Sequence, residues 1–252
     1  MGKRLNVFIL AAGRGLRMGK LGKEIPKSLA NINNSTILSK ILQRLDKVKK
    51  KKKYFFVLGY KYKKILGELK NNKIKFNYTL NKNYSKTGSA YSWYLLRKYL
   101  PKNKNDTILI HADIYFHYSH LDKIFSSKKE NIIGSVKKLK KNTKRKGWVL
   151  DASKDLQVTR LRQKKNYLGY YGEISCINRF SYKSMKKIFN FMNYYFLKNG
   201  KDFTWEILLN DIVRNKILKI YTNKNYKKKN FWFNINKPDD LIKVRTFVKT
   251  IR

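Results

Sequence analysis

A glycine-rich turn near the N-terminus carries the clearest chemical signal in the sequence. Gly13 and Gly15 follow an apolar run, and Arg17 and the Pro26-Lys27 step come shortly afterwards. Glycine allows positive φ angles and close approach, so such a turn can point backbone N–H groups at a phosphate. The motif is neither a dinucleotide fingerprint, because a third glycine is missing, nor a Walker A loop. An ordinary turn explains the glycines alone, but not the basic residues beside them.

Two oxygen-bearing side chains farther along the chain are candidate ligands for a divalent cation. Asp113 ends the sequence His111-Ala112-Asp113, which follows the apolar stretch 107–110, and Asn236 follows an aromatic stretch. Carboxylate and amide oxygens suit Mg²⁺. Each residue also has a structural explanation, because Asp often ends a strand and Asn236 could cap the helix expected after it. His111 and His117 lack the spacing of a zinc site, and we interpret them as structural.

The elements that must position these residues alternate between strands and helices. Buried strands are predicted at 5–12, 54–58, 74–80 and 107–110, and helices at 35–48, 60–70 and 89–99. This order predicts an α/β fold with a Rossmann-like, doubly wound, mostly parallel sheet, whose ligands bind at the carboxyl ends of the strands. A smaller strand-rich part follows, with strands at 132–136, 148–151, 158–161 and 172–177, helices near 183–198 and 204–215, a strand at 217–221 and a closing helix from 239.

The composition is strongly basic but not that of a disordered chain. Lys and Arg number 60 against 15 Asp and Glu, a formal net charge of +45, while 42% of the 252 residues are hydrophobic and 14% aromatic. That apolar content excludes a disordered polycation. Lys is spread along the whole chain beside many Asn, Ile, Tyr and Phe, which share A/T-rich codons. Genome composition therefore explains the charge without a partner, and binding to nucleic acid or an anionic surface is the alternative.

Cysteine content and hydropathy indicate the cellular compartment in which the protein is expected. The one cysteine, Cys176, excludes an internal disulfide framework and a thiolate zinc cluster. The apolar stretch at 7–12 is too short for a signal-peptide core, and no segment approaches the roughly 20 apolar residues that span a bilayer. We therefore expect a cytoplasmic protein without membrane insertion.

Several motifs, in order, resemble those of a known superfamily. LAAGRGLRMG with PKSL is followed by LGY, by NKNY ahead of TGSAYSW, by HAD and by FNINKPDDL. Over nearly the whole chain these motifs resemble nucleotidyltransferases of the sugar-phosphate pyrophosphorylase type. NKNY through YSWY, GWV and DFTWE are most similar to bacterial choline-phosphate and 2-aminoethylphosphonate cytidylyltransferases.

The resemblance implies a role for each motif residue. Arg17 and Lys27 would be catalytic, by neutralising charge at the α-phosphate of the nucleotide. Asp113 and Asn236 would hold Mg²⁺, although relatives commonly carry Asp at the position of Asn236, and Asn234 likewise replaces a frequent acid. The nucleotide would be bound, largely through backbone atoms, by Ala11, Ala12, Gly13, Gly15, Gly59, Gly88, Ser89 and Ser92.

The resemblance also implies an acceptor pocket. Trp148 and Trp205 would face a cationic amine, for which Trp is the most favourable ring, and Asp202 and Glu206 would add an anionic rim. Both tryptophans could equally be core residues. The single domain over 1–252 would then comprise a nucleotide-binding core in about 1–130, an acceptor-binding lobe in about 131–230 and a closing strand and helix in 231–252.

The implied reaction is transfer of CMP from CTP to phosphocholine or a similar amine-bearing phosphate or phosphonate, with release of pyrophosphate. A sugar-1-phosphate or polyol-phosphate acceptor is the alternative within the superfamily. A basic nucleic-acid-binding protein is the alternative outside it, although dispersed Lys does not favour it. The base, the acceptor and the oligomeric state stay open at this point.

Overall fold

One large sheet organises the fold of the computed structural model, which describes residues 4–100, 104–136, 147–164, 170–224 and 230–250. Its first half consists of four parallel strands in the spatial order β5 (Phe76–Leu80), β4 (Lys52–Leu58), β1 (Leu5–Ala11) and β6 (Thr107–His111). Every residue of β1 is buried, as expected for a strand that is covered on both faces. The predicted parallel α/β core is confirmed, with strand ends that differ by one or two residues.

The second half of the chain extends the same sheet with antiparallel strands. β11 (Gly172–Phe180) pairs with β6, and around it lie β8 (Ile132–Val136), β9 (Gly147–Ala152) and β10 (Val158–Lys164). The prediction of a strand at 217–221 is wrong in extent. Only β12 (Tyr221–Thr222) forms there, because β8 offers it just Ile132 and Ile133 as partners.

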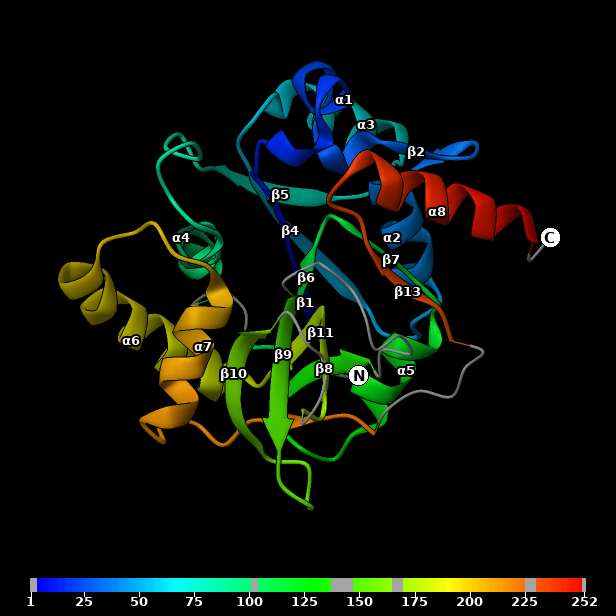
Figure 1. The fold of residues 1–252 in the computed structure, drawn as a ribbon. Coiled ribbons are helices and arrows are strands. Elements are labelled where there is room, and N and C mark those ends of the chain that lie inside the picture. The colour runs from blue at the N-terminus through cyan, green and yellow to red at the C-terminus, as the bar shows by residue number, and fades with distance from the viewer. Residues whose placement is uncertain (1–3, 101–103, 137–146, 165–169, 225–229, 251–252) are drawn as a thin grey trace.

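Helices flank the sheet on two sides (Figure 1). On one side lie α4 (Ser89–Tyr94), α6 (Tyr182–Asn199) and α7 (Trp205–Arg214), and on the other α2 (Ile37–Asp46), α5 (Ser119–Ser126) and α8 (Pro238–Thr250). Thr36 caps α2, since its Oγ1 accepts a hydrogen bond from the backbone N–H of Ser39 at 3.0 Å. The helix predicted at 89–99 is α4 continued by a 3₁₀ turn, η3 (Leu95–Tyr99), while α3 (Tyr62–Asn71) follows β4 as predicted.

Several short elements are missed from sequence. They are η1 (Leu16–Met18), α1 (Lys20–Glu24), η2 (Lys27–Leu29), β2 (Asn31–Ile32), β3 (Ser35–Thr36), α5 and β7 (Ile114–Phe116). β7 matters most, because it pairs antiparallel with β13 (Trp232–Asn234) and sets Asn234 opposite Ile114. This small ladder carries the C-terminal segment to the end of β6, where Asp113 lies.

One hydrophobic core joins the two halves. Trp93 of α4 and Trp205 of α7 are both fully buried in it, and the Trp93 ring stacks on Phe180 of β11 with centroids 5.6 Å apart. Core packing therefore fixes α4 and α7, which flank the carboxyl ends of the central strands, relative to the sheet. Within the described part of the chain, none of the helices has the length and apolar character needed to cross a bilayer.

Candidate active site

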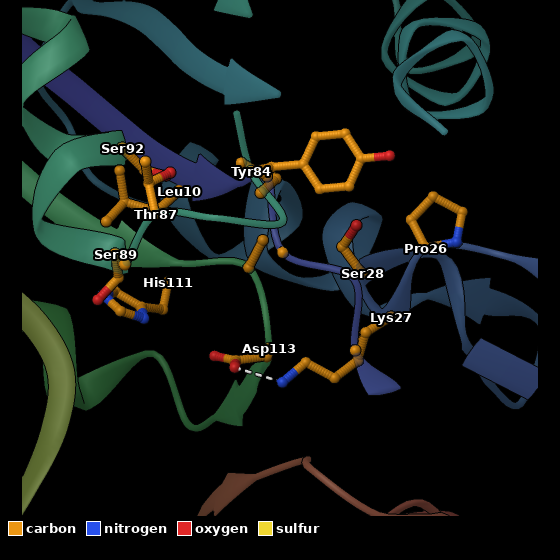
Figure 2. Close-up of a pocket in the computed structure, with 16 residues that line it drawn as sticks. Leu10, Pro26, Lys27, Ser28, Tyr84, Thr87, Ser89, Ser92, His111 and Asp113 are labelled. Atoms are coloured by element: carbon orange, nitrogen blue, oxygen red, sulfur yellow. Dashed lines mark hydrogen bonds and ion pairs between the residues drawn. The ribbon is translucent and has the colours of Figure 1, made fainter. Parts of the chain in front are cut away.

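Two adjoining cavities lie at the carboxyl ends of β1 and β6, the edge at which ligands bind in open parallel sheets. The first cavity, drawn in Figure 2, has a volume of about 200 Å³, and the second about 350 Å³. Their walls share Lys27, Ser89, His111 and Asp113. Ligands bound in the two cavities would therefore meet beside these four side chains.

The glycine-rich turn and the start of α4 form the first cavity. The predicted nucleotide-binding residues in its wall are Ala11, Ala12, Gly13, Gly15, Gly88, Ser89 and Ser92. Gly15 has a φ of 63°, a left-handed conformation that glycine adopts without strain. A Cβ added to Gly15 would lie 3.0 Å from Cβ of Lys27. The turn thus brings exposed backbone directly beside the lysine.

Gly59 lies behind this wall rather than in it. A Cβ at Gly59 would lie 2.6 Å from the carbonyl oxygen of Ala12 and 2.9 Å from Cβ of Tyr84. The backbone N–H of Tyr60 donates to the same Ala12 oxygen at 3.0 Å. The missing side chain of Gly59 therefore lets the end of β4 approach the turn, and its direct contact with a ligand stays a prediction.

Four predicted site residues from separate segments form a charged cluster, defined as Arg17, Lys27, Asp113 and Asn236. Lys27 Nζ donates to Asp113 Oδ2 at 2.6 Å and to Asn236 Oδ1 at 3.0 Å. The first of these contacts is the dashed line in Figure 2. Arg17 Nη2 donates to the same Asn236 oxygen at 3.0 Å. The cluster stands at the boundary between the two cavities, because both contain Lys27 and Asp113 in their walls.

The cluster fits a divalent cation through its oxygen donors. Asp113 Oδ2 and Asn236 Oδ1 converge on one point, which the Lys27 ammonium group takes up. No group of three or more His, Cys, Asp or Glu side chains suited to a metal occurs among the described residues. A site with one carboxylate and one amide oxygen suits Mg²⁺, which usually takes one or two protein carboxylates and completes its shell with waters and substrate phosphates.

Local charge keeps Asp113 ionised. Burial alone would raise the pKa of its carboxyl, but the positive charge of Lys27 and its hydrogen bond outweigh this effect, so the pKa is lowered from its ordinary value. Burial has the opposite consequence for the neighbouring imidazole and lowers the pKa of His111. A negative carboxylate and a neutral imidazole therefore stand side by side at the end of β6.

The second cavity is lined by acids and an aromatic ring as well as by the charged cluster. Trp148 and Glu206, both predicted acceptor-binding residues, lie in its wall, as does Glu173 of β11. Glu173 and Glu206 are 4% and 8% exposed. Burial raises the pKa of Glu206 to about 7, and the charge of Asp113 adds to the effect. A cation in this cavity would relieve the cost of ionising such a buried carboxyl.

Two predicted acceptor residues lie elsewhere. Trp205 is fully buried, and its ring faces His111 at a centroid distance of 5.4 Å. Asp202 is exposed just before α7 and belongs to neither cavity wall. The burial of Trp205 agrees with the core alternative stated from sequence, whereas the contact of Asp202 with an acceptor stays a prediction. The amphipathic helix α7 places Trp205 in the core and Glu206 at the cavity, since adjacent residues on a helix point in different directions.

Some lining residues were not predicted from sequence to be site residues. They include Tyr84, Thr87 and His111 in the first cavity and Gln163, Glu173 and Cys176 in the second. Glu173 had a detectable signal, because it is the one acidic residue of the strand predicted at 172–177. Asn81, also buried, donates to Thr87 Oγ1 at 2.9 Å and Ser92 Oγ at 3.1 Å and so fixes part of the first wall.

Sequence comparison connects the chain with characterised proteins. The family described as "Domain of unknown function (DUF6564)" matches residues 24–152. The bifunctional protein GlmU of Methanococcus aeolicus is 26% identical over 97% of this chain and 54% of its own length. CTP:phosphoglutamine cytidylyltransferase of Campylobacter jejuni is 25% identical over 88% of this chain and 83% of its own. The chain thus spans about half the length of GlmU and most of the length of the cytidylyltransferase.

Structural comparison confirms the predicted fold. CTP:phosphocholine cytidylyltransferase (LicC) of Streptococcus pneumoniae is similar with a TM-score of 0.78 and 21% identity, over 97% of this chain and 99% of that one. The inositol-1-phosphate CTP transferase of T. maritima has a TM-score of 0.79 and 17% identity, over 98% and 97%. At these identities the likeness concerns the fold, which is the one that the motifs predicted.

Proposed function

We propose that this chain, which belongs to the family described as Domain of unknown function (DUF6564), transfers a nucleotidyl group to a small phosphorylated acceptor. Its fold is that of the sugar-phosphate-type nucleotidyltransferases. The observation that carries the proposal is the charged cluster between two cavities. One cavity is bordered by a glycine-rich turn suited to a triphosphate, and the other holds room for a second substrate. Lys27 contributes to both walls and thus to the point of transfer.

The chemistry of the transfer needs positioning and charge neutralisation. An oxygen of the acceptor phosphate attacks the α-phosphorus, a new P–O bond forms, and the bond to pyrophosphate breaks with its electrons on the leaving group. Lys27 and Arg17 stabilise the negative charge that develops, which is where preorganised donors act most strongly. Asp113 and Asn236 would hold Mg²⁺, which supplies Lewis-acid polarisation of phosphate oxygens when bound. No covalent intermediate with the protein is involved.

The donor in our proposal is CTP, and the acceptor bears an amine, as phosphocholine and aminoethylphosphonate do. Support for the amine comes from the second cavity, in which the Trp148 ring and the carboxyls of Glu173 and Glu206 face one space. In a chain of net charge +45, this local set of acids and the Trp148 ring favour a cationic substrate over a neutral one. Support for CTP comes from the three cytidylyl-transferring relatives named above.

A polyol or sugar phosphate is the second candidate acceptor. The same cavity also contains the neutral polar side chains of Gln163 and Asn234, which suit hydroxyl groups. The T. maritima relative, by its name, acts on inositol 1-phosphate. This acceptor class would leave Glu206 without a cationic partner, which is why we place it second.

The test is a pyrophosphate-release matrix. Four nucleoside triphosphates are combined with phosphocholine, aminoethylphosphonate, inositol 1-phosphate and several sugar phosphates, with Mg²⁺ and with excess chelator. We expect release with CTP and an amine-bearing acceptor, and none with the Lys27→Ala variant. Pyrophosphate release with sugar phosphates alone would contradict the amine-bearing acceptor and favour a sugar-phosphate acceptor in its place. No release with any pair, together with a nucleic-acid mobility shift that weakens with salt, would favour the basic binding protein instead.

A further inference from the structure

His111 is the last residue of β6 and faces the boundary between the two cavities. It lies opposite Leu10 of β1 in the parallel register, beside the start of the glycine-rich turn. Of the four residues that both walls share, Lys27 and Asp113 bond to each other, and Ser89 Oγ accepts from the backbone N–H of Trp205 at 3.1 Å. His111 Nε2 is shielded from solvent and has no hydrogen-bond partner among the described residues.

Core packing holds the His111 ring in this place. Its centroid is 5.4 Å from that of Trp205, with the planes tilted by 58°, and Trp205 is itself fully buried. The residue that orients the imidazole therefore also orients Ser89. Leaving a buried polar atom unpaired costs folding free energy. A fixed ring whose nitrogen has no partner among the described residues, at a wall that both cavities share, is a candidate contact for a ligand atom.

We propose that His111 is a substrate-binding residue whose Nε2 hydrogen-bonds an oxygen of the acceptor's phosphate or phosphonate group. The inference rests on the proposed function and identifies a residue that the sequence interpretation had set aside as structural. A phosphate seated at the shared wall would meet Lys27 on one side and His111 on the other. His111 neither gains nor loses a proton in the transfer, because the attacking phosphate oxygen already carries negative charge. Its role is to orient that oxygen toward the α-phosphorus.

The kinetic test uses two variants of His111 and one control. His111→Phe keeps a ring against Trp205 but removes Nε2, while His111→Gln restores an amide nitrogen at a similar reach. We expect His111→Phe to raise the KM for the acceptor by at least about ten-fold, with the KM for the nucleotide little changed and partial rescue in His111→Gln. His117→Phe is the control, because His117 hydrogen-bonds Ser119 and lies in neither cavity wall. Wild-type KM values in His111→Phe would overturn the proposal.

A binding measurement without turnover separates this inference from the proposed function. The chain has three histidines, so the imidazole nitrogens give three sets of NMR correlations, which single His→Phe variants assign. We expect phosphocholine, and more weakly inorganic phosphate, to shift the Nε2 signal of His111 but not those of His117 and His120. An unshifted His111 signal would overturn the contact. An enzyme that releases no pyrophosphate with any substrate pair, yet shows the shift, would overturn the proposed function and leave the contact standing.

Discussion

Lys27 and Asp113 form an ion pair with 2.6 Å between Nζ and Oδ2, although 86 residues separate them in the chain. The same ammonium group bonds Asn236 at 3.0 Å. A side-chain cation thus takes up the point at which the two candidate metal ligands converge. Lys27 and Mg²⁺ would compete for these oxygens, and a lysine released from them would be free to contact phosphate.

Removing either basic residue of the cluster is expected to slow turnover without unfolding the protein. Lys27→Ala and Arg17→Ala should each lower kcat by at least about ten-fold, because a preorganised donor at developing charge contributes roughly 3–4 kcal/mol. Lys20→Ala, an exposed position in the nearby α1, is the matched control and should behave as wild type. Steady-state kinetics with circular dichroism measures both effects. Near-normal kcat in both cluster variants would contradict the placement of transfer at this cluster.

Metal affinity should follow the charge of the two oxygen donors. Asp113→Ala should abolish activity at ordinary Mg²⁺ concentrations, whereas Asn236→Asp should stay active and bind metal at least as tightly, since it adds an anionic oxygen. Titration calorimetry with Mn²⁺ measures affinity directly and independently of turnover. Asp122→Ala, at an exposed position of α5, is the control. An Asp113→Ala protein with unchanged Mn²⁺ affinity would rule out this metal site.

Ionisation of Glu206 should lower the stability of the folded protein as pH rises and, over the same range, strengthen binding of a cationic acceptor. Its pKa lies at about 7 in the folded state against an ordinary 4.5. The native protein therefore binds more protons than the unfolded chain between these values, and stability falls as pH rises through this window, by on the order of 3 kcal/mol in total. A cationic acceptor needs the ionised carboxylate, so its KM should decrease over the same rise.

Glu206→Gln tests this linkage. The variant cannot ionise, so its Tm should exceed that of wild type at pH 8 by more than at pH 5. Its KM for phosphocholine should be higher than that of wild type at pH 8 and should lose the pH dependence centred near 7. Thermal melts and kinetics from pH 5 to 8 provide both readouts. A variant that melts below wild type at pH 8 would show that the carboxylate stabilises the free protein.

Substitution of Trp205 and substitution of Trp148 should have different effects on stability and on the KM for the acceptor. Trp205→Leu removes a fully buried ring and should destabilise the protein by about 2–5 kcal/mol, whichever acceptor is used. Trp148 is half-buried in the wall of the second cavity. Trp148→Leu should raise the KM for an amine acceptor several-fold and cost little stability, since a cation–π contact contributes roughly 0.5–2 kcal/mol. Denaturant melts paired with KM measurements distinguish them. Equal stability losses would show Trp148 to be a core residue.

Gly88 should tolerate no side chain. A Cβ there would lie 1.8 Å from the carbonyl oxygen of Phe203, so Gly88→Ala must move either the start of α4 or the segment before α7. We expect a lower Tm and a raised KM for the nucleotide. Gly67→Ala is the matched control, because its Cβ would meet no atom within 4 Å and alanine favours α3 by roughly 0.5–1 kcal/mol. A Gly88→Ala protein as stable as wild type would mean that these segments move freely apart.

Local sequence patterns are enough to predict the parallel strands of the sheet and the loop that carries the chemistry. β1, β4 and β6 are continuous apolar runs buried on both faces, and this pattern depends only on local sequence. The glycine-rich turn could also be predicted from sequence, because a left-handed backbone conformation such as that of Gly15 is usually occupied by glycine. Arg17, Lys27, Asp113 and Asn236 were also singled out, although no local pattern says that they touch.

Which side chains meet depends on long-range packing that no local pattern predicts. Asn236 reaches Lys27 because the three-residue strands β7 and β13 pair, and strands this short have no detectable periodicity. Trp205 and Glu206 are neighbours in sequence, yet α7 turns one into the core and the other into the second cavity. His111 is a candidate because its ring packs on Trp205 at the wall that both cavities share and its Nε2 has no partner in the described part of the chain. Residue type sets what a side chain can bond, whereas long-range packing sets what it finds within reach.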